Sequence, residues 1–165
     1  MNPGLIYASI TGYGQTGPYS GRGGYDVMVE GEFGLMHIPG EHDGPPIKVG
    51  VAVTDLTTGS YAANSILAAL LARGQNCGQG QWLDAALSDC QTAILANIAS
   101  SVLVSGQRDS GRWGTARPII VPYRGFKTKD GNITIGGGND KLLGSLCDRI
   151  GRPEWKEDPR FMANK

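Results

Sequence analysis

Apolar residues recur with a strand-like period at two places in the first half of the chain. Residues 5–11, LIYASIT, form a short run of apolar and β-branched residues bounded by glycines, which is typical of a buried strand. Residues 82–87, WLDAAL, place Leu83, Ala85 and Leu87 at every second position, which is the period of a strand. The sequence therefore predicts two strands that lie far apart in the chain.

Apolar spacings of three and four residues predict helices around these strands. We expect a helix over residues 54–73, where Thr54 or Asp55 can cap the start and Gly74 ends the helix. Another helix is predicted over residues 88–105, directly after the second strand. Strands that alternate with helices in this way are typical of an α/β layer with parallel strands.

Different patterns mark the rest of the chain. Residues 25–39 favour a helix over part of their length, residues 119–138 predict a hairpin that turns at Asp130 and Gly131, and residues 139–151 predict a short amphipathic helix. The polar, arginine-bearing loop at 106–118 separates the two patterns, so we place a domain boundary there. A doubly wound sheet does not start with a lone strand, so we expect the chain to be the central part of a longer protein.

A carboxylate stands where the strand pattern changes to a helix pattern. Ser88 and Gln91 fit a capping box, which makes Asp89 the first helical residue, close to the positive end of the helix dipole. One interpretation is that Asp89 only complements the dipole, which is worth about 0.3–1 kcal/mol. The other is that an ionised carboxylate at the C-terminal end of a strand, where α/β sheets bind ligands, serves as a nucleophile.

Charge and hydropathy restrict the partners. Acidic and basic residues number 15 each and the isoelectric point is near 6.7, so nothing favours binding to nucleic acid or to an anionic membrane surface. No apolar run reaches the roughly 18 residues that span a bilayer, and the first residues do not form a signal peptide. We expect a small-molecule or protein partner.

The cysteines and histidines do not predict a metal site. Cys77, Cys90 and Cys147 are odd in number and lack metal-ligand spacing, which favours an intracellular, reduced chain in which Cys90 and Cys147 are small core residues. His37 and His42 have no partner at the spacing of a metal site or a catalytic triad, so both are interpreted as structural or surface residues.

Two glycine-rich loops and three charged residues have open interpretations. Residues 12–24 and residues 136–140 both follow predicted strands, and their glycines either bring the backbone close to a ligand or only form turns. Asp26 either caps a helix or contacts a ligand. Arg112 and Arg117 flank a loop without nearby acids, where they either hold a substrate carboxylate or remain solvated charges.

Three longer segments together resemble the central part of the class III CoA-transferases, the formyl-CoA and carnitine type. They are residues 2–36, residues 43–73 and residues 78–91, in the order and spacing of that family. The segments SITGYGQTG, RWGTARPIIVPYRGFKTKDG and GGGND further resemble the succinyl-CoA:glutarate branch of the family, which uses dicarboxylates.

The resemblance implies a fold and a function. The fold is a Rossmann-like parallel sheet, of which residues 1–106 form the C-terminal part with the nucleophile, followed by a linker and the start of a smaller α+β domain at 107–165. The activity is transfer of CoA from a succinyl-CoA-like donor to a carboxylic or dicarboxylic acid through an aspartyl-CoA thioester. The CoA thioester is a substrate, and no cofactor is bound permanently. Family members form interlocked homodimers, and the compartment is the mitochondrion or the cytoplasm.

The resemblance also assigns roles to residues of this chain. Asp89 stands in the context of the family's nucleophile. The residues assigned to CoA or to the developing oxyanion are Gly12, Tyr13, Gly14, Gly136, Gly137 and Gly138, and those assigned to a dicarboxylate are Arg112 and Arg117. No metal ligand is implied.

Two alternatives remain open. The related α-methylacyl-CoA racemases have a histidine where this chain has Tyr25, and a tyrosine of pKa near 10 is a poor base at neutral pH. The racemases also lack an aspartate in the context of Asp89. The second alternative is a truncated, non-catalytic homologue, and we expect the isolated chain to have little or no activity.

Overall fold

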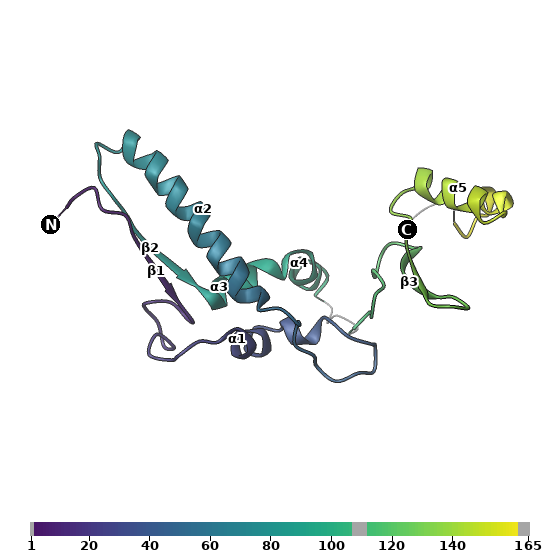
Figure 1. The fold of residues 1–165 in the computed structure, drawn as a ribbon, viewed down its shortest axis with the longest axis horizontal. Helices are drawn as coiled ribbons and strands as arrows, with labels where there is room; N and C mark the ends of the chain where they lie inside the picture. The colour runs from purple at the N-terminus through teal and green to yellow at the C-terminus, as the bar shows by residue number, and fades with distance from the viewer. Residues whose placement is uncertain (1, 107–111, 162–165) are drawn as a thin grey trace. The chain divides into compact units, whose positions relative to one another are not determined.

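A computed structural model describes residues 2–106 and 112–161 of the chain, which fall into two units (Figure 1). The larger unit contains residues 1–39 and 46–111, and the smaller unit contains residues 40–45 and 112–165. Residues 107–111, which are part of the polar loop where we expect a domain boundary, lie outside the described residues.

The larger unit is built around two parallel strands. Its elements are β1 (Tyr7–Thr11), α1 (Asp26–Glu32), the 3-10 helix η1 (Leu35–His37), α2 (Val53–Gln75), β2 (Trp82–Ala86), α3 (Leu87–Ile94) and α4 (Ala96–Ser105). Strands β1 and β2 pair in register from Tyr7 opposite Trp82 to Thr11 opposite Ala86. Helix α2 connects the strands and lies along them (Figure 1). The predicted α/β class with parallel strands is confirmed.

The strands are more exposed than the sequence predicts. Tyr7 and Ile10 are each 57% exposed and Trp82 is 59% exposed, although residues 5–11 were expected to form a buried strand. Of the described helices, only α2 packs extensively on both strands, so much of the two-stranded sheet is left uncovered. The prediction of the strand is confirmed, and the prediction of its burial is wrong for the described residues.

The start of α2 is capped by a residue from another helix. Neither Thr54 nor Asp55 caps α2, because the helix begins earlier, at Val53, and its flanking residue makes no side-chain cap bond. Instead, the Oδ1 atom of Asp26 in α1 accepts from the backbone nitrogens of Thr54 at 2.9 Å and Asp55 at 3.4 Å. The carboxylate thus satisfies donors that a helix start leaves without partners.

The predicted ends of two helices differ from the structure. Helix α2 continues past Gly74 to Gln75, and the chain then turns through left-handed residues at Cys77, with φ of 48°, and Gly78, with φ of 77°. The helix expected over residues 88–105 is divided into α3 and α4, bent by 71°. Ala96, with φ of 40°, stands at this break, where right-handed helical geometry is interrupted.

No single described helix is long and apolar enough to cross a membrane. Taken together, the bent pair α3 and α4 meets the requirement by length and composition only.

The smaller unit follows the sequence prediction closely. Its elements are β3 (Tyr123–Lys127), β4 (Asn132–Gly136), α5 (Asp140–Arg149) and the 3-10 helix η2 (Pro153–Glu157). The antiparallel hairpin of β3 and β4 turns where the backbone nitrogen of Thr128 donates to the Gly131 carbonyl at 2.9 Å. The Asn139 side chain caps α5 by accepting from the Leu142 backbone nitrogen at 2.9 Å. The predicted hairpin and amphipathic helix are confirmed.

Candidate active site

Asp89 lies in the first turn of α3, directly after β2, and its side chain is exposed. The backbone nitrogen of Ser88 donates to the Gly12 carbonyl at 3.0 Å, which ties the start of α3 to the loop after β1. The Ser88 hydroxyl donates to the Oδ1 atom of Asp89 at 3.3 Å. The carboxylate therefore stands at the carboxyl ends of both parallel strands, where sheets of this class bind ligands.

The predicted capping box at Ser88 and Gln91 is wrong. Helix α3 begins at Leu87, two residues before Asp89, so Asp89 is its third residue, and no side chain caps the helix. The Oε1 atom of Gln91 accepts a short hydrogen bond from the Thr54 hydroxyl of α2 instead, and both side chains are fully buried. This bond holds α3 against α2 at Gln91, which lies less than one helical turn from Asp89.

A cavity of about 270 Å³ opens beside Asp89. It is lined by Tyr61, Ser65, Asp84, Ala85, Ala86, Asp89, Cys90 and Ala93. The Oδ2 atom of Asp84 accepts from the backbone nitrogen of Gln15 at 2.7 Å, so Asp84 is held by the loop after β1. The cavity brings together two carboxylates and the two hydroxyls of Tyr61 and Ser65.

Three polar residues that line this cavity, Asp84, Tyr61 and Ser65, were not among the predicted site residues. Asp84 follows the alternation of a strand and gave no sign of facing a cavity. Tyr61 and Ser65 lie four residues apart, so they share one face of α2. This spacing can be read from the sequence, but it does not show whether that face of the helix borders a cavity or solvent.

The predicted CoA-contacting loop is held by close packing at Gly12. A Cβ atom at Gly12 would lie 2.4 Å from the Cα atom of Gly24, so two stretches of backbone touch there. Gly14 has φ of 88°, which favours glycine, and its nitrogen donates to the Thr11 hydroxyl at 2.8 Å. These contacts explain the glycines without a ligand, and contact with CoA stays a prediction.

Tyr13 of the same loop belongs to a charged aromatic cluster. Its hydroxyl donates to Glu32 at 2.8 Å, and the Arg22 guanidinium lies 4.8 Å from the Tyr13 ring and 4.7 Å from the Tyr19 ring. Arg22 also pairs with Glu32 at 2.5 Å. Burial and the hydrogen bond to Glu32 raise the pKa of Tyr13, and the bond from Arg22 lowers the pKa of Glu32. The cluster fastens the loop to α1.

Two acids of α1 support the start of α2 from within the larger unit. Asp26 is buried and lies 3.2 Å from the Lys48 ammonium. Glu30 is fully buried, and its Oε2 atom accepts from the Val49 backbone nitrogen at 3.0 Å. Burial raises the pKa of Glu30, and the nearby charge of Asp26 adds to that effect. Of the two interpretations of Asp26, the structure supports the cap.

The glycines predicted after β4 lie in the smaller unit. Gly136 ends β4, and the nitrogen of Gly137 donates to the Pro122 carbonyl at 2.7 Å. A Cβ atom at Gly137 would lie 3.1 Å from the Cδ atom of Pro122, whereas Gly138 has open space around it. At Gly136 a Cβ atom would lie 3.6 Å from the Tyr123 ring, which is an ordinary contact, so of the three only Gly137 is tightly packed.

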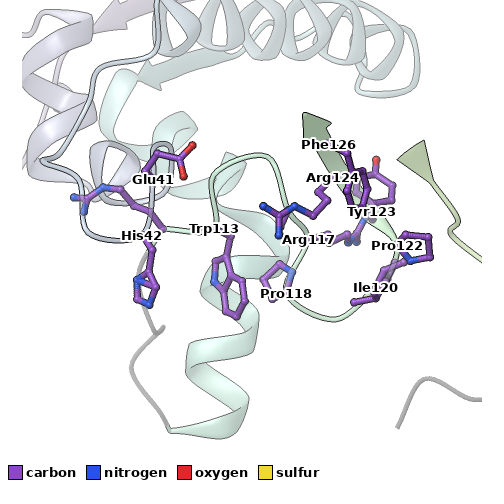
Figure 2. Close-up of a pocket in the computed structure, with 13 residues that line it drawn as sticks. Glu41, His42, Trp113, Arg117, Pro118, Ile120, Pro122, Tyr123, Arg124 and Phe126 are labelled. Carbon is purple, nitrogen blue, oxygen red and sulfur yellow. The ribbon is translucent and has the colours of Figure 1, made fainter. Parts of the chain in front are cut away.

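The predicted dicarboxylate anchors also lie in the smaller unit. Arg112 and Arg117 line a cavity of about 480 Å³ (Figure 2). Glu41 lines it too, so the expectation of a loop without nearby acids is wrong, because residues 40–45 return to this loop. Arg112 is not a solvated charge, since it is only 9% exposed and donates to the Gly44 carbonyl at 2.6 Å.

The remaining predictions concern metal ligands, histidines and cysteines. Within residues 2–106 and 112–161, no three His, Cys, Asp or Glu side chains gather as a metal site would require. His37 ends η1, and His42 is exposed beside Asp43. Cys90 and Cys147 are buried, as predicted.

The amino-acid sequence of this chain is similar to those of several known proteins. The model of CoA-transferase family III matches residues 1–165. Succinyl-CoA:glutarate CoA-transferase of Mus musculus is 47% identical over 162 residues, which are 98% of this chain and 37% of the relative. Succinate–glutarate CoA-transferase of Agrobacterium fabrum is 47% identical over 165 residues, which are 100% of this chain and 41% of the relative.

A solved structure agrees with these relatives. The crystal structure of a CAIB/BAIF family protein from Brucella suis matches with a TM-score of 0.78 and 45% identity, over 99% of this chain and 43% of that chain. The chain thus spans less than half the length of the proteins that it matches.

Proposed function

Because the chain belongs to CoA-transferase family III, we propose that the protein moves CoA from an acyl-CoA to a free carboxylic acid. The observation that carries this proposal is the place of Asp89, an exposed carboxylate at a helix start beside a cavity. The names of the relatives favour a dicarboxylic pair such as succinyl-CoA and glutarate.

In the proposed mechanism Asp89 is the nucleophile. A carboxylate oxygen of Asp89 attacks the thioester carbonyl, the C–S bond breaks, and a mixed anhydride forms while CoA thiolate leaves. The thiolate attacks the Asp89 carbonyl of the anhydride, which releases the donor acid and leaves an aspartyl-CoA thioester. The acceptor carboxylate attacks that thioester, and the thiolate then attacks the acceptor carbonyl, which yields the new acyl-CoA and free Asp89.

The residues around Asp89 support this chemistry. The Ser88 hydroxyl donates to one oxygen of the Asp89 carboxylate and orients it. Tyr61 and Ser65 line the same cavity and can donate hydrogen bonds to a thioester oxygen as it gains charge. We assign contact with CoA or the oxyanion to the loops at 12–14 and 136–138.

The test is trapping of the aspartyl thioester. Hydroxylamine added during turnover should convert Asp89 to a hydroxamate that mass spectrometry locates. Asp89→Asn should lower the transfer rate by roughly 10³-fold or more, since it removes the nucleophile. Asp84→Asn is the matched control, because Asp84 lines the same cavity. A hydroxamate at Asp84, or at any residue other than Asp89, would refute the assignment.

Two other results would favour the alternatives. Deuterium exchange at the α-carbon of the acyl group without CoA transfer would favour a racemase. Binding of acyl-CoA without any turnover would favour a non-catalytic homologue.

We also propose assembly as a homodimer inside the cell, in the mitochondrion or the cytoplasm. Large apolar side chains of α2 are exposed in the single chain, among them Leu71 at 78% and Leu56 at 65%, and a partner subunit would cover such a face. Light scattering measures the assembly state, and fractionation of cells measures the compartment.

A further inference from the structure

The cavity of the smaller unit carries an excess of positive charge. Three arginines, Arg112, Arg117 and Arg124, line this volume of about 480 Å³, against the single carboxylate of Glu41 (Figure 2). Like charges brought together without compensation favour an anion among them. The cavity is therefore chemically suited to a negatively charged group.

The three arginines differ in what already holds them. The buried Arg112 donates from Nη1 to the Gly44 carbonyl, and its buried Nε has no hydrogen-bond partner among the described residues. Arg112 thus forms part of the wall and contributes its charge. Arg117 and Arg124 are exposed, and neither forms an ion pair within residues 2–106 and 112–161.

Aromatic rings place the two exposed guanidinium groups. The guanidinium carbon of Arg117 lies 5.9 Å from the Tyr123 ring centre, and that of Arg124 lies 5.7 Å from the Phe126 ring centre. Figure 2 labels both arginines together with Tyr123 and Phe126 in the lining of the cavity. A ring beside a guanidinium restricts its motion and leaves N–H donors available, in a fork that matches a carboxylate.

The rest of the lining is mainly apolar. Trp113, Pro118, Ile120 and Pro122 contribute to it. An apolar wall beside a cluster of arginines suits a short hydrocarbon chain that ends in a carboxylate better than it suits a strongly hydrated phosphate.

We propose that this cavity binds one carboxylate of a dicarboxylic acid, which Arg117 and Arg124 hold while the methylene chain lies against the apolar wall. The identity of the acid as a CoA acceptor or donor rests on the proposed function. The binding itself does not depend on catalysis. In this proposal Arg117 and Arg124 hold the carboxylate, in place of the pair Arg112 and Arg117 that was expected from the sequence.

The experiment measures binding of glutarate and of pentanoate, a monocarboxylate of the same chain length, by calorimetry in the absence of CoA. The unmodified protein should bind glutarate at least tenfold more tightly than pentanoate. The double variant Arg117→Gln/Arg124→Gln should remove this preference, since both charge-assisted forks are lost. Each single variant should lower it in part.

Arg152→Gln is the matched control. Arg152 lies 5.5 Å from the Trp155 ring centre in the same unit, but it pairs with Glu154 and does not line the cavity. This variant should leave glutarate binding unchanged. Arg117→Lys/Arg124→Lys, which keeps the charge and loses the fork, should retain only part of the preference, and thermal melting should show that every variant folds.

Other outcomes overturn the proposal. Absence of glutarate binding by the unmodified protein, or an unchanged preference in the double variant, would refute it. CoA binding is measured separately by the same method. If the double variant loses affinity for CoA and keeps its preference for glutarate, the arginines bind a phosphate instead, and the proposal is wrong. Binding measured in Asp89→Asn separates this result from the proposed function, since that variant should lose transfer and keep glutarate binding.

Discussion

Asp89 in the larger unit is positioned by backbone and buried hydrogen bonds, whereas Arg117 and Arg124 in the smaller unit are positioned by aromatic rings. The helix that carries Asp89 is tied to Gly12 through its backbone and to Thr54 through the buried Gln91. The two arginines stand on a loop and a strand with exposed side chains. A group held by backbone and buried hydrogen bonds is fixed more precisely than an exposed side chain beside a ring, and the proposed role of Asp89 as a nucleophile requires such fixed placement.

This difference also appears in what each unit buries. The largest fully buried side chains of the larger unit include Gln91 and Glu30, which are polar. Gln91 Oε1 accepts from the Thr54 hydroxyl and Glu30 Oε2 accepts from the Val49 backbone nitrogen, whereas Gln91 Nε2 and Glu30 Oε1 have no hydrogen-bond partner among the described residues. The bonds that are made favour one arrangement of the segments that they join. In the smaller unit the α5 residues Cys147, which is fully buried, and Leu146 instead line an apolar cavity of about 300 Å³, together with Phe126 and Ile135 of the hairpin.

The strongest way to disturb the larger unit is Gly12→Ala. The new Cβ atom would meet the Gly24 backbone at 2.4 Å, which a side-chain rotation cannot relieve, so the loop and the start of α3 must shift. We expect the free energy of unfolding to fall by about 2–4 kcal/mol and the transfer rate to fall with it. Urea unfolding and turnover measure the two effects.

Gly23→Ala is the control for that variant, because nothing lies within 4 Å of a Cβ atom at Gly23 and its φ is not left-handed. It should alter stability by less than about 1 kcal/mol. Equal losses from the two variants would mean that the loop is not held by the contact between Gly12 and Gly24.

A smaller effect should come from Glu30, through pH. Burial raises the pKa of this carboxyl above the ordinary value of 4.5, so the folded state prefers its protonated form. The stability that it contributes is fully present below pH 4.5 and is lost as the pH rises through the higher folded pKa. Glu30→Gln, which stays neutral, should therefore gain stability relative to the unmodified protein as the pH rises from about 4 to about 7.

Urea unfolding of the Glu30→Gln variant at several pH values measures this trend. Glu154→Gln, at an exposed position of the smaller unit, is a control that should not reproduce it. If the advantage of Glu30→Gln over the unmodified protein shrinks as the pH rises, burial does not raise the pKa of Glu30.

The smallest effect is expected in the smaller unit, from Tyr123→Leu. This change removes the ring beside Arg117 and leaves the charge of the cavity intact. Since an exposed contact of this kind is worth about 0.5–1 kcal/mol, glutarate affinity should fall roughly two- to fivefold. Tyr123→Phe keeps the ring and should bind as before; a similar loss in both variants would show that the hydroxyl, and not the ring, matters.

The elements that could be predicted from the sequence are those whose determinants are local. The alternation in residues 82–87 predicted β2, the turn at Asp130 and Gly131 predicted the hairpin, and the amphipathic pattern of residues 139–151 predicted α5. Each of these signals lies within a few residues of its effect. The resemblance of the whole chain to its family is likewise confirmed by the match over residues 1–165.

The features that the sequence did not predict have two kinds of cause: contacts between residues far apart in the chain, and an unusual backbone conformation. Asp26 caps a helix that starts more than twenty residues later, and no local pattern reports such a partner. Arg112 bonds to the Gly44 carbonyl across an even longer stretch of chain. The break at Ala96 requires an alanine in the left-handed backbone conformation, which the amino-acid sequence does not predict. The nucleophile role of Asp89 was implied by the resemblance to the family and stays a prediction, whereas the neighbouring Tyr61 and Ser65 are placed by the packing of α2.

The contact between Gly12 and Gly24 restricts how this loop can vary. A side chain added at Gly24 would approach the Cα atom of Gly12 to 2.2 Å, just as one added at Gly12 would collide with Gly24. Neither position has a bulky group whose shortening might compensate for a change at the other. In a library that randomises both codons and selects for active protein, survivors should therefore keep glycine at both, with no rescuing pair.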